Sequence, residues 1–506
     1  MTASVERWDV FEVALEGPSD GNPFVDFVFG AVFETEGRRV ETAGFYDGDG
    51  VYRVRFMPDR EGAWRYRVCS DRAELDGRTG TFNCSPPSPA NHGPVGIAKR
   101  HHFSYADGTP FLPMGTTAYA WVHRPEEVRS KSLESFARYG FNKIRMLVFP
   151  KQYGDGKLVD ISYQPPFLPF EGRPGEWDYS RPNPAFFRHY EDRVRELCGL
   201  GIEADVILFH PYDASLWRLP QGMTEADDLR YVEYLAARLS SMRNVWWSLA
   251  NEYDRMAPDR FREKNWDRIG SRLAEVDPCG HPRSIHNWPF VDPYPDRTWM
   301  THVSYQHPNT FSLLIRLKEQ YGKPVINDEY QYEGEMPYDW GSCSPEIEVR
   351  RHWMATMAGG YATHGEVLKT GDSIKDYFWS YGGELQGGSP PRLAYMRKIV
   401  ESCPFQDMVV DWRATDGRDA FCLAKDDDVY LYFITPEHKL PRATWIGPGQ
   451  GPREEYEIAV HDVWECREVG RQTVKGGHFR GDLPPWAVLV ARRIEPRSWV
   501  EEARKQ

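Results

Sequence analysis

The chain has 506 residues, of which 41% are hydrophobic, and this content can build the packed cores of about two to four domains. The formal net charge of −13 argues against nucleic-acid binding, because phosphate recognition needs clustered Lys and Arg. No run of about 18 apolar residues could cross a membrane, and MTASVERWDV lacks the charged-then-apolar pattern of a secretory signal. We therefore expect a cytoplasmic protein that binds neither nucleic acid nor membranes and that could form a homo-oligomer.

The N-terminal part has the two-residue period of β-strands. In VYRVRFMPDREGAWRYRV, residues 51–68, apolar residues alternate with arginines on both sides of a Pro-Asp-Arg-Glu-Gly turn. This pattern predicts a hairpin with one buried face and one solvated face, the latter carrying Arg53 and Arg55. Further strands are expected at 8–15 and 25–34, so residues 1–88 are predicted to form an immunoglobulin-like β-sandwich.

A segment rich in Pro, Ser, Asn and Gly, residues 84–94, marks a linker, and the pattern changes after it. Short apolar runs then alternate with amphipathic helices, one of which carries Phe186, Tyr190, Val194 and Leu197 on a single stripe. The runs cover 111–121, 141–150, 201–210, 244–252, 282–288, 302–307, 323–329 and 359–366. Eight such units favour an α/β fold with a (β/α)8 TIM barrel over residues 95–405.

The β pattern returns in the C-terminal part. DVYLYFIT, YEIAVHDV and WAVLVARRI, separated by connections rich in Gly and Pro, predict a second β-sandwich over residues 406–506. The eight cysteines of the whole chain are scattered, with no CxxC pair and no Cys/His spacing typical of zinc. We expect mostly buried thiols, one pair to check (Cys69 with Cys84), no metal and no cofactor.

Two glutamates end apolar runs of the predicted barrel. Glu252 closes NVWWSLANE and Glu329 closes KPVINDE, 77 residues further on, which corresponds to about three β/α units. An acid at the carboxyl end of a barrel strand faces the active-site cup, and three units around the ring set the two acids on opposing sides. There, two carboxylates about 5 to 5.5 Å apart could flank one glycosidic bond, as a retaining glycosidase requires. Asp254 and Asp328 are neighbouring acids, but alternation along the strand turns Asp328 away if Glu329 points inward.

The motifs NVWWSLANEYD and PVINDEYQYEG resemble those of clan A retaining glycoside hydrolases, and more closely those of bacterial glycosidases with apiosidase-like barrels. The resemblance implies that Glu252 is the acid/base, Glu329 the nucleophile and Asn251 the partner of the hydroxyl next to the anomeric carbon. It also implies that Arg145 orients Glu329 and holds it ionised. The sixth-strand aromatic matches Tyr305, with His307 as a competitor for that position.

The chain departs from the clan pattern at the eighth strand. GGYATHGE has no clear counterpart of the usual tryptophan, and Trp379 in the following loop is the expected substitute. The remaining candidates for substrate contact also follow predicted strands: His210, Trp121 and His364. A long insertion, residues 151–180, is expected to wall the cup and to favour a closed pocket.

These observations predict a retaining O-glycosyl hydrolase that acts on the end of a chain or on a small sugar, with carbohydrate as its partner. One alternative is a metal-dependent amidohydrolase barrel, which needs a His-x-His after the first strand; FLPMGTTAYAW contains none. The other is a carbohydrate-binding protein without catalysis, against which the presence of both glutamates argues.

Overall fold

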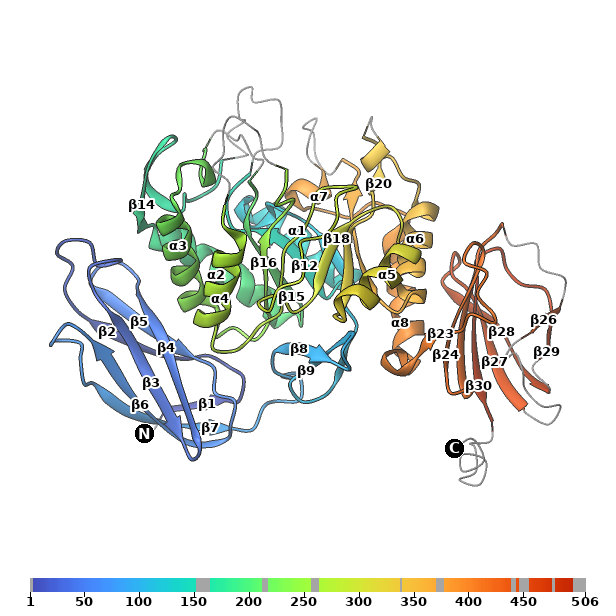
Figure 1. Cartoon of the computed structure of the whole chain (residues 1–506), viewed down its shortest axis with the longest axis horizontal. Coiled ribbons are helices and arrows are strands. Elements are labelled where there is room, and N and C mark those ends of the chain that lie inside the picture. The colour runs from blue at the N-terminus through green and yellow to red at the C-terminus, as the bar shows by residue number, and fades with distance from the viewer. Residues whose placement is uncertain are drawn as a thin grey trace. The chain divides into compact units, whose positions relative to one another are not determined.

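The computed structural model describes residues 3–151, 164–211, 217–255, 264–336, 339–369, 377–437, 443–445, 455–475 and 478–494 (Figure 1). The chain divides into two compact units, which we describe one at a time. The first unit comprises Met1–Gln306 with Lys369–Leu385, and the second His307–Leu368 with Gln386–Gln506.

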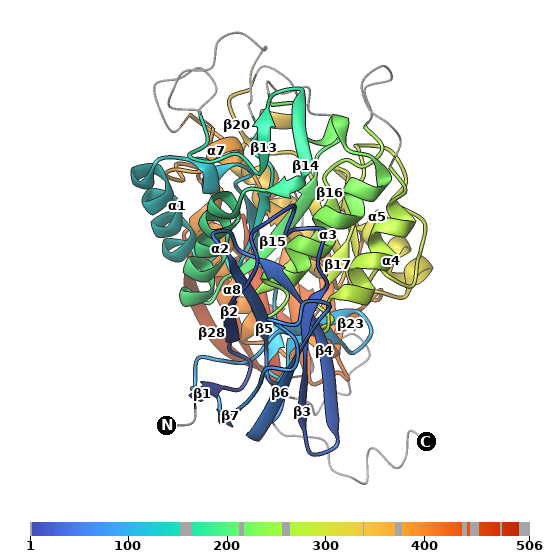
Figure 2. The same cartoon turned by 90° about the vertical axis from the view of Figure 1, so that its left-hand side faces the viewer.

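The first unit begins with a seven-stranded sheet in the order β1-β7-β6-β3-β4-β5-β2 (Figure 2). Its core contains apolar and aromatic side chains from six of these strands, and the ring centroids of Phe33 and Phe56 lie 4.4 Å apart. The strands are β1 (Ala3–Glu6), β2 (Phe11–Glu16), β3 (Phe29–Thr35), β4 (Arg38–Tyr46), β5 (Val51–Phe56), β6 (Gly62–Ser70) and β7 (Thr79–Ser85).

The hairpin predicted for residues 51–68 is wrong, although both of its strands exist. β5 pairs with β2 and β4, whereas β6 pairs with β3 and β7. Phe56 of β5 and Trp64 of β6 instead meet through their rings, with centroids 4.8 Å apart. The alternation of apolar residues determines which face of a strand is buried, but it does not determine which strand lies next to it in the sheet.

The expected solvated face of β5 is also wrong, because it carries a buried charge cluster. Arg55, which is 5% exposed, donates to Glu12 at 2.8 Å and to Glu191 at 3.0 Å. Arg238 also binds Glu191, and it donates to Asp47 at 2.9 Å. Burial by itself raises the pKa of Glu191, but the charges of Arg238 and Arg55 outweigh burial and lower it. The cluster connects the first sheet to two helices of the same unit.

The parallel part of the first unit follows a small antiparallel sheet, β8 (Val95–Ala98), β9 (His102–Tyr105) and β10 (Pro110–Phe111). Five parallel strands are then neighbours in the order β17-β16-β15-β12-β11. Residues of β12, β15 and β16 are buried throughout, as expected for strands covered on both faces. The five strands are β11 (Gly115–Thr117), β12 (Lys143–Leu147), β15 (Glu203–Phe209), β16 (Val245–Ala250) and β17 (Arg283–Ser284), and β18 (Val303–Gln306) is a further strand of this unit.

Helices follow β11, β12, β15 and β16, as the sequence predicts. The α2 stripe of Phe186, Tyr190, Val194 and Leu197 is buried, and α3 packs against α4 (Figure 2). Thr224 and Asp227 form a reciprocal capping box that starts α3. The helices of this unit are η1 (Trp121–His123), α1 (Glu126–Arg138), α2 (Pro184–Gly199), η3 (Pro220–Gly222), α3 (Glu225–Leu239), α4 (Trp266–Val276) and α7 (Phe378–Tyr381).

The predicted insertion lies partly outside the described residues. Its described part includes the hairpin β13 (Phe170–Arg173) and β14 (Glu176–Pro182). From β14, the Trp177 indole donates to the carbonyl of Trp217 at 2.7 Å, and the Tyr179 hydroxyl donates to that of Leu219 at 2.8 Å. The loops after β12 and β15 are therefore fastened together.

The second unit contains a parallel pair of strands with flanking helices. β19 and β21 pair in parallel, and all their residues are buried. Gly322, with φ near +60°, ends α5. The elements are α5 (Ser312–Tyr321), β19 (Val325–Glu329), β20 (Glu333–Gly334), η4 (Asp339–Gly341), α6 (Pro345–Met357), β21 (Tyr361–His364), β22 (Glu366–Val367), α8 (Ser389–Glu401) and η5 (Phe405–Asp407). Each of the eight runs predicted from the sequence contains a strand.

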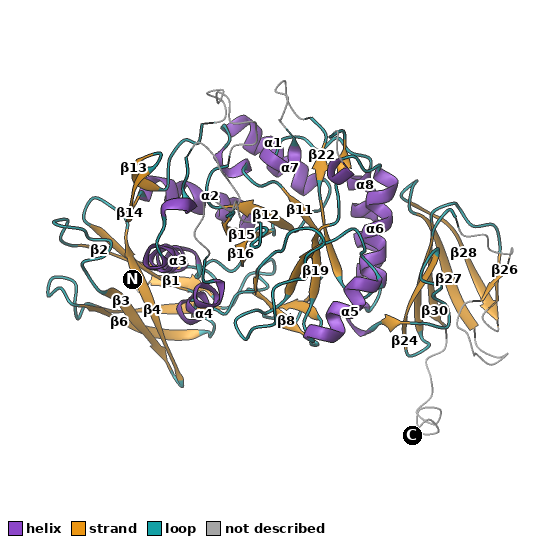
Figure 3. Ribbon diagram, turned by 45° about the horizontal axis from the view of Figure 1, so that its top comes forward, coloured by secondary structure: helices purple, strands orange, loops and turns teal. Residues whose placement is uncertain are grey.

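The described C-terminal residues of the second unit after η5 contain strands and loops but no helix (Figure 3). Six antiparallel strands follow the order β23-β24-β25-β30-β27-β28, and β26 pairs with β29. Phe433 of β25 stacks on Trp353 of α6, with ring centroids 5.2 Å apart. The strands are β23 (Val409–Val410), β24 (Ala420–Lys425), β25 (Val429–Ile434), β26 (Ala443–Trp445), β27 (Glu455–Asp462), β28 (Arg467–Lys475), β29 (His478–Arg480) and β30 (Ala487–Arg493), which confirms the three strands predicted here.

Two further expectations concern membranes and cysteines. In the described part of the chain, no helix has both the length and the apolar character that crossing a bilayer requires. The cytoplasmic location stays a prediction. All eight cysteines are described and are free thiols, so Cys69 and Cys84 are not paired.

Replacing Glu191 by Ala should destabilise the protein strongly. The change leaves Arg55 and Arg238 buried without their shared anion, and breaking a buried ion pair in this way costs about 3 to 5 kcal/mol. Thermal unfolding followed by circular dichroism would measure the effect. Glu127→Ala is the matched control, because Glu127 pairs with Lys131 at 2.8 Å on the surface and should leave the midpoint nearly unchanged. Equal midpoints for the two variants would show that the cluster does not stabilise the fold.

Candidate active site

Strand β16 ends at Ala250, and Asn251 and Glu252 follow it directly, 1% and 5% exposed. Glu252 has φ +51°, in the left-handed region that non-glycine residues rarely adopt. Such conformations cost on the order of 1 to 3 kcal/mol and concentrate at functional sites. The backbone amide of Asn251 donates to the carbonyl of Phe209 at 3.0 Å. The backbone amide of Tyr253 donates to the carbonyl of His286 at 2.9 Å. The strands on both sides therefore hold this strained segment.

The Asn251 side chain is fixed by a residue of β12 and by one that follows β11. Arg145, the third residue of β12, donates to Asn251 Oδ1 at 2.7 Å. The Tyr119 hydroxyl, just after β11, donates to the same oxygen at 3.1 Å, and Arg145 donates to that hydroxyl at 3.3 Å. With Oδ1 accepting both bonds, the amide nitrogen of Asn251 is oriented as a donor.

Trp379 joins the same cluster through Tyr119. The two rings meet edge to face with centroids 5.8 Å apart, and the Tyr119 amide donates to the Trp379 carbonyl at 2.9 Å. Trp379 is half-buried. Tyr119 was missed from the sequence, although it stands in the quoted run FLPMGTTAYAW. Its position two residues after β11 was the available signal.

The Glu252 carboxylate forms an ion pair with Arg255 at 3.3 Å. The guanidinium of Arg255 also lies over the ring of Trp288, 3.9 Å from the ring centroid, and the Arg255 side chain is about half exposed. Asp254 turns aside and accepts a hydrogen bond from the Trp288 amide at 2.7 Å. Burial raises the pKa of Asp254.

In the second unit, Glu329 is the last residue of β19 and is 3% exposed. Its carbonyl accepts a hydrogen bond from the His307 amide at 3.0 Å. Asn327 donates to the His307 carbonyl at 2.8 Å, which ties His307 to this strand. Asp328 accepts a hydrogen bond from Thr363 of β21 at 2.7 Å, so it is engaged with the neighbouring strand. Burial, together with the charge of Arg316, lowers the pKa of the half-buried His307.

His364 ends β21 within a buried group that includes Glu333 and Glu366, with potential ligand atoms within 4.8 Å of one another. The two carboxylates are occupied by the Gly-rich loop before α8. Glu366 accepts from the amides of Gln386 and Gly387, both at 2.8 Å. Glu333 accepts from the amides of Gly388 and Ser389 at 2.6 and 2.9 Å. This group therefore fastens a loop.

The electrostatics of this group follow from its burial. Burial raises the pKa of Glu366 to about 8, aided by the charge of Glu333 and opposed by its two backbone hydrogen bonds. Burial and His352 lower the pKa of His364 to about 3, so its imidazole is neutral at physiological pH.

The other expected contact residues, Trp121, His210 and Tyr305, are all buried. Trp121 is fully buried and packs edge to face on Phe136 of α1, a position that does not favour substrate contact. His210 is buried beside Phe149, and Tyr305 is buried within β18. Their roles stay predictions.

Glu366→Gln should change how stability depends on pH. Because the folded-state pKa of about 8 lies above the usual 4.5, the Glu366 contribution is fully present below pH 4.5 and is lost as the pH rises to about 8. The loss is on the order of a few kcal/mol. As the pH rises from about 5 to 9, the thermal midpoint of Glu366→Gln should therefore rise relative to that of the wild type.

Glu384→Gln, at an exposed position of the neighbouring segment, is the control and should track the wild type at every pH. A constant difference between Glu366→Gln and wild type would contradict the raised pKa.

Comparison with known proteins identifies relatives of the whole chain. Residues 98–366 match the family described as apiosidase-like, catalytic domain, and residues 4–71 match a domain of unknown function. A Bacteroides vulgatus protein, described from its crystal structure as a candidate glycoside hydrolase, is 35% identical with a TM-score of 0.87. The alignment covers 97% of this chain and 100% of that one.

A second crystal structure from the same organism supports the fold alone. This glycoside hydrolase of family 5 is 17% identical with a TM-score of 0.60, over 82% of this chain and 96% of that one. No curated protein matches the chain. The match to more than half of the chain, with the 35% identity over almost all of it, carries the assignment: the chain belongs to the apiosidase-like family of glycoside hydrolases.

Proposed function

We propose that this glycosidase cleaves O-glycosidic bonds by a retaining, two-step mechanism and acts on a terminal or small sugar. Glu252 is the acid/base and Glu329 the nucleophile. The observation that carries the proposal is the buried, strained Asn251–Glu252 segment after β16, whose amide is oriented by Arg145 and Tyr119. An arrangement with no catalytic or binding role would gain nothing from that strain.

In the first step the Glu329 carboxylate attacks the anomeric carbon while Glu252 gives its proton to the departing oxygen. In the second step Glu252, now ionised, takes a proton from water, and the water oxygen displaces Glu329. Asn251 offers its amide hydrogens to the hydroxyl next to the anomeric carbon. Trp379 presents a half-buried ring on which a sugar face could stack.

Arg255 opposes the acid role of Glu252 in the free enzyme, because a neighbouring cation favours the ionised carboxylate. Its guanidinium is about half exposed and already rests on Trp288, 3.9 Å from the ring centroid. We propose that a bound sugar separates Arg255 from Glu252, while the contact with Trp288 keeps the arginine nearby.

The barrel and its boundaries belong to the same proposal. Residues 95–405 are proposed as the (β/α)8 catalytic barrel, residues 1–88 as the immunoglobulin-like domain and residues 406–506 as the C-terminal sandwich. Parallel strands followed by helices in both units support the barrel. The sheet at residues 3–85, antiparallel except for the β1–β7 pair, and the antiparallel sheets at 409–493 support the two flanking domains.

Action on a terminal sugar is supported by the loops after β12 and β15. The hydrogen bonds from Trp177 and Tyr179 to Trp217 and Leu219 fix these loops to each other. Such fastened loops favour a closed pocket over an open cleft. Carbohydrate is the proposed partner; a homo-oligomer stays a prediction.

The product should keep the anomeric configuration of the substrate, because two displacements at one carbon restore it. A panel of nitrophenyl furanosides and pyranosides would first provide a substrate, and proton NMR during early turnover would then show the first anomer released. Initial release of the opposite anomer would exclude the retaining mechanism.

The two glutamates should respond differently to removal. Glu329→Ala should be inactive on every substrate, because the nucleophile is needed whatever the leaving group. Glu252→Ala should keep much of its first-step rate on dinitrophenyl glycosides, whose leaving group needs no proton. On glycosides of poor leaving groups it should lose about 10²- to 10⁴-fold.

Azide distinguishes the two roles further. With Glu252→Ala it should attack the covalent intermediate and give a glycosyl azide of the substrate's configuration; with Glu329→Ala it should give the inverted one. If the two variants gave the opposite configurations, Glu329 would be the acid/base and Glu252 the nucleophile. Glu127→Ala is the control for each assay, since Glu127 lies on the surface, and full activity in both test variants would refute the assignment.

A further inference from the structure

The loop Asp277-Pro278-Cys279-Gly280-His281 connects α4 to β17 in the first unit. Ligand atoms of Asp277, Cys279 and His281 lie within 4.8 Å of one another. Gly280 has φ +69°, which lets the chain turn sharply enough to bring Cys279 and His281 to the same side. Three potential ligands of different chemistry therefore stand on five consecutive residues.

His281 supplies the observation that points to a ligand. Its ring is fully buried, and Nε2 lies 2.9 Å from the carbonyl of Ser240, so Nε2 carries the proton and donates. Nδ1 is then a bare lone pair, and no hydrogen-bond donor among the described residues reaches it. A buried acceptor without a donor costs about 1 to 3 kcal/mol. A metal ion would use that lone pair.

Asp277 keeps coordinating capacity beside the bonds it already makes. Its Oδ2 accepts from the Trp247 indole at 3.1 Å and from the His281 amide at 2.8 Å. Its Oδ1 accepts from the Cys279 amide at 3.1 Å. Because a carboxylate oxygen has two lone pairs, Oδ1 can still bind a cation while the loop keeps its shape.

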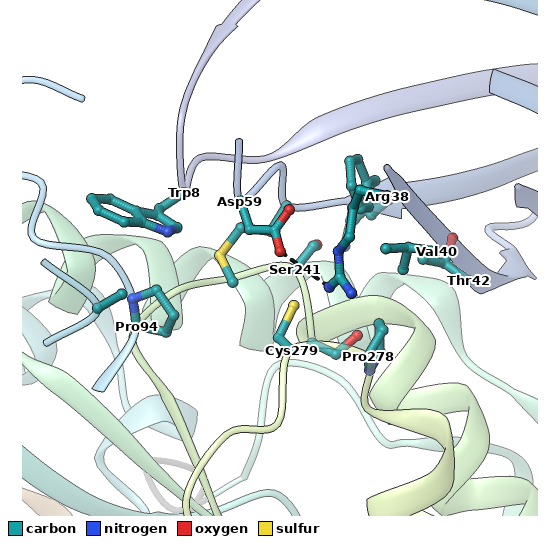
Figure 4. Close-up of a pocket in the computed structure, with 14 residues that line it drawn as sticks. Trp8, Arg38, Val40, Thr42, Asp59, Pro94, Ser241, Pro278 and Cys279 are labelled. Carbon is teal, nitrogen blue, oxygen red and sulfur yellow. Dashed lines mark ion pairs between the residues drawn. The ribbon is translucent and has the colours of Figure 1, made fainter. Parts of the chain in front are cut away.

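Cys279 brings the third donor to the edge of a cavity of about 170 Å³. Figure 4 shows its thiol directed into the space below Arg38. The guanidinium of Arg38 is paired with Asp59 at 3.0 Å, so its charge is balanced. The cavity has room for a water molecule as a fourth ligand.

We propose that Asp277 Oδ1, Cys279 Sγ and His281 Nδ1 bind one Zn²⁺, with water from the cavity completing a tetrahedral site. Zinc bonds of about 2.0 to 2.3 Å set such donors roughly 3.3 to 3.8 Å apart, and ligand atoms of the three residues already lie within 4.8 Å of one another. Cys279 releases its thiol proton to solvent when the Zn–S bond forms. The thiolate and the carboxylate then neutralise the dication, and the guanidinium of Arg283, 3.6 Å from Asp277 Oδ2, adds one positive charge beside the site.

The second cluster with suitable residues, Glu333, His364 and Glu366, is a weaker candidate. Both of its carboxylates already hold the loop before α8 through four backbone amides. It also lacks sulfur, so the two clusters can be distinguished by spectroscopy.

The position of the loop indicates a structural role for the metal. It precedes β17, whereas the candidate catalytic residues follow the carboxyl ends of their strands. Zinc should therefore raise the thermal midpoint and leave the turnover of a purified substrate unchanged.

The test uses the full chain stripped with a chelator and then titrated with ZnCl₂ or CoCl₂. We expect about one zinc per chain and a thiolate-to-cobalt charge-transfer band in the near ultraviolet. Cys279→Ser should lose the band, and His281→Gln should weaken zinc binding at least about 100-fold, since even outer-shell changes cost 10- to 100-fold. Cys69→Ser, which removes another partly exposed free thiol, and His364→Gln are the controls and should keep both signals.

Alkylation of the wild type gives a reading that does not depend on variants folding. Zinc should protect Cys279 from iodoacetamide in peptide mass maps and leave Cys69 reactive. Absence of the cobalt band in wild type, its persistence in a folded Cys279→Ser variant, or equal alkylation with and without zinc would overturn the site.

Discussion

A parallel strand that is buried on both faces has room for a charged side chain chiefly where it ends, and this constraint organises the first unit. β16 is apolar apart from Ser248, and its polar residues come immediately afterwards, at Asn251 and Glu252. Partners of Asn251 include Arg145, the third residue of β12, and Tyr119, which lies two residues after β11. Polar groups within or just after β11, β12 and β16 thus meet, and the hydrogen bonds of Asn251 are the consequence.

The opposite end of these strands also carries polar groups, but they are satisfied in a different way. At the amino end of β15, Glu203 accepts from the Trp246 indole at 3.0 Å, and Asp205 pairs with Lys143. Each partner comes from an adjacent strand, so these groups are closed within the sheet. At the carboxyl end, Glu252 is paired with a half-exposed arginine and is held in a strained conformation. That asymmetry is what separates residues that stabilise from residues that can meet a substrate.

The sequence predicted most of the elements, because the period of the apolar residues is a local property. All eight strand-like runs contain strands, and the α2 stripe is buried. The predictions of a hairpin at residues 51–68 and of a solvated face on β5 were wrong. Which strand pairs with which, and which side chains meet in the folded protein, depend on residues far away in the sequence. Arg55 has the sequence surroundings of a surface arginine and becomes buried only because Glu191 approaches from α2.

Prediction of the site had the same limit, because the sequence shows where a residue stands along a strand but not which side chains it meets. The rule that site residues stand at strand ends predicted Asn251, Glu252, Arg145, Glu329 and Trp121, whose roles stay predictions; the structure packs Trp121 against Phe136 of α1. The rule also passed over Tyr119, since a tyrosine in an apolar run reads as core until its hydroxyl is seen on Asn251. The sequence also did not predict the proposed zinc loop at Asp277, because a single residue separates Cys279 from His281. This spacing is shorter than those typical of zinc sites.

The two kinds of polar cluster place opposite demands on the same unit. The charges around Glu191 are buried, mutually neutralising and distant from the strand ends, so their strength can be maximised without affecting chemistry. The proposed acid/base role of Glu252 requires its carboxylate to exchange a proton with substrate, which strong fixed partners would prevent. Stabilising interactions elsewhere in the unit offset the strain at Glu252, and the fold can therefore tolerate a left-handed glutamate where a glycine would be easier.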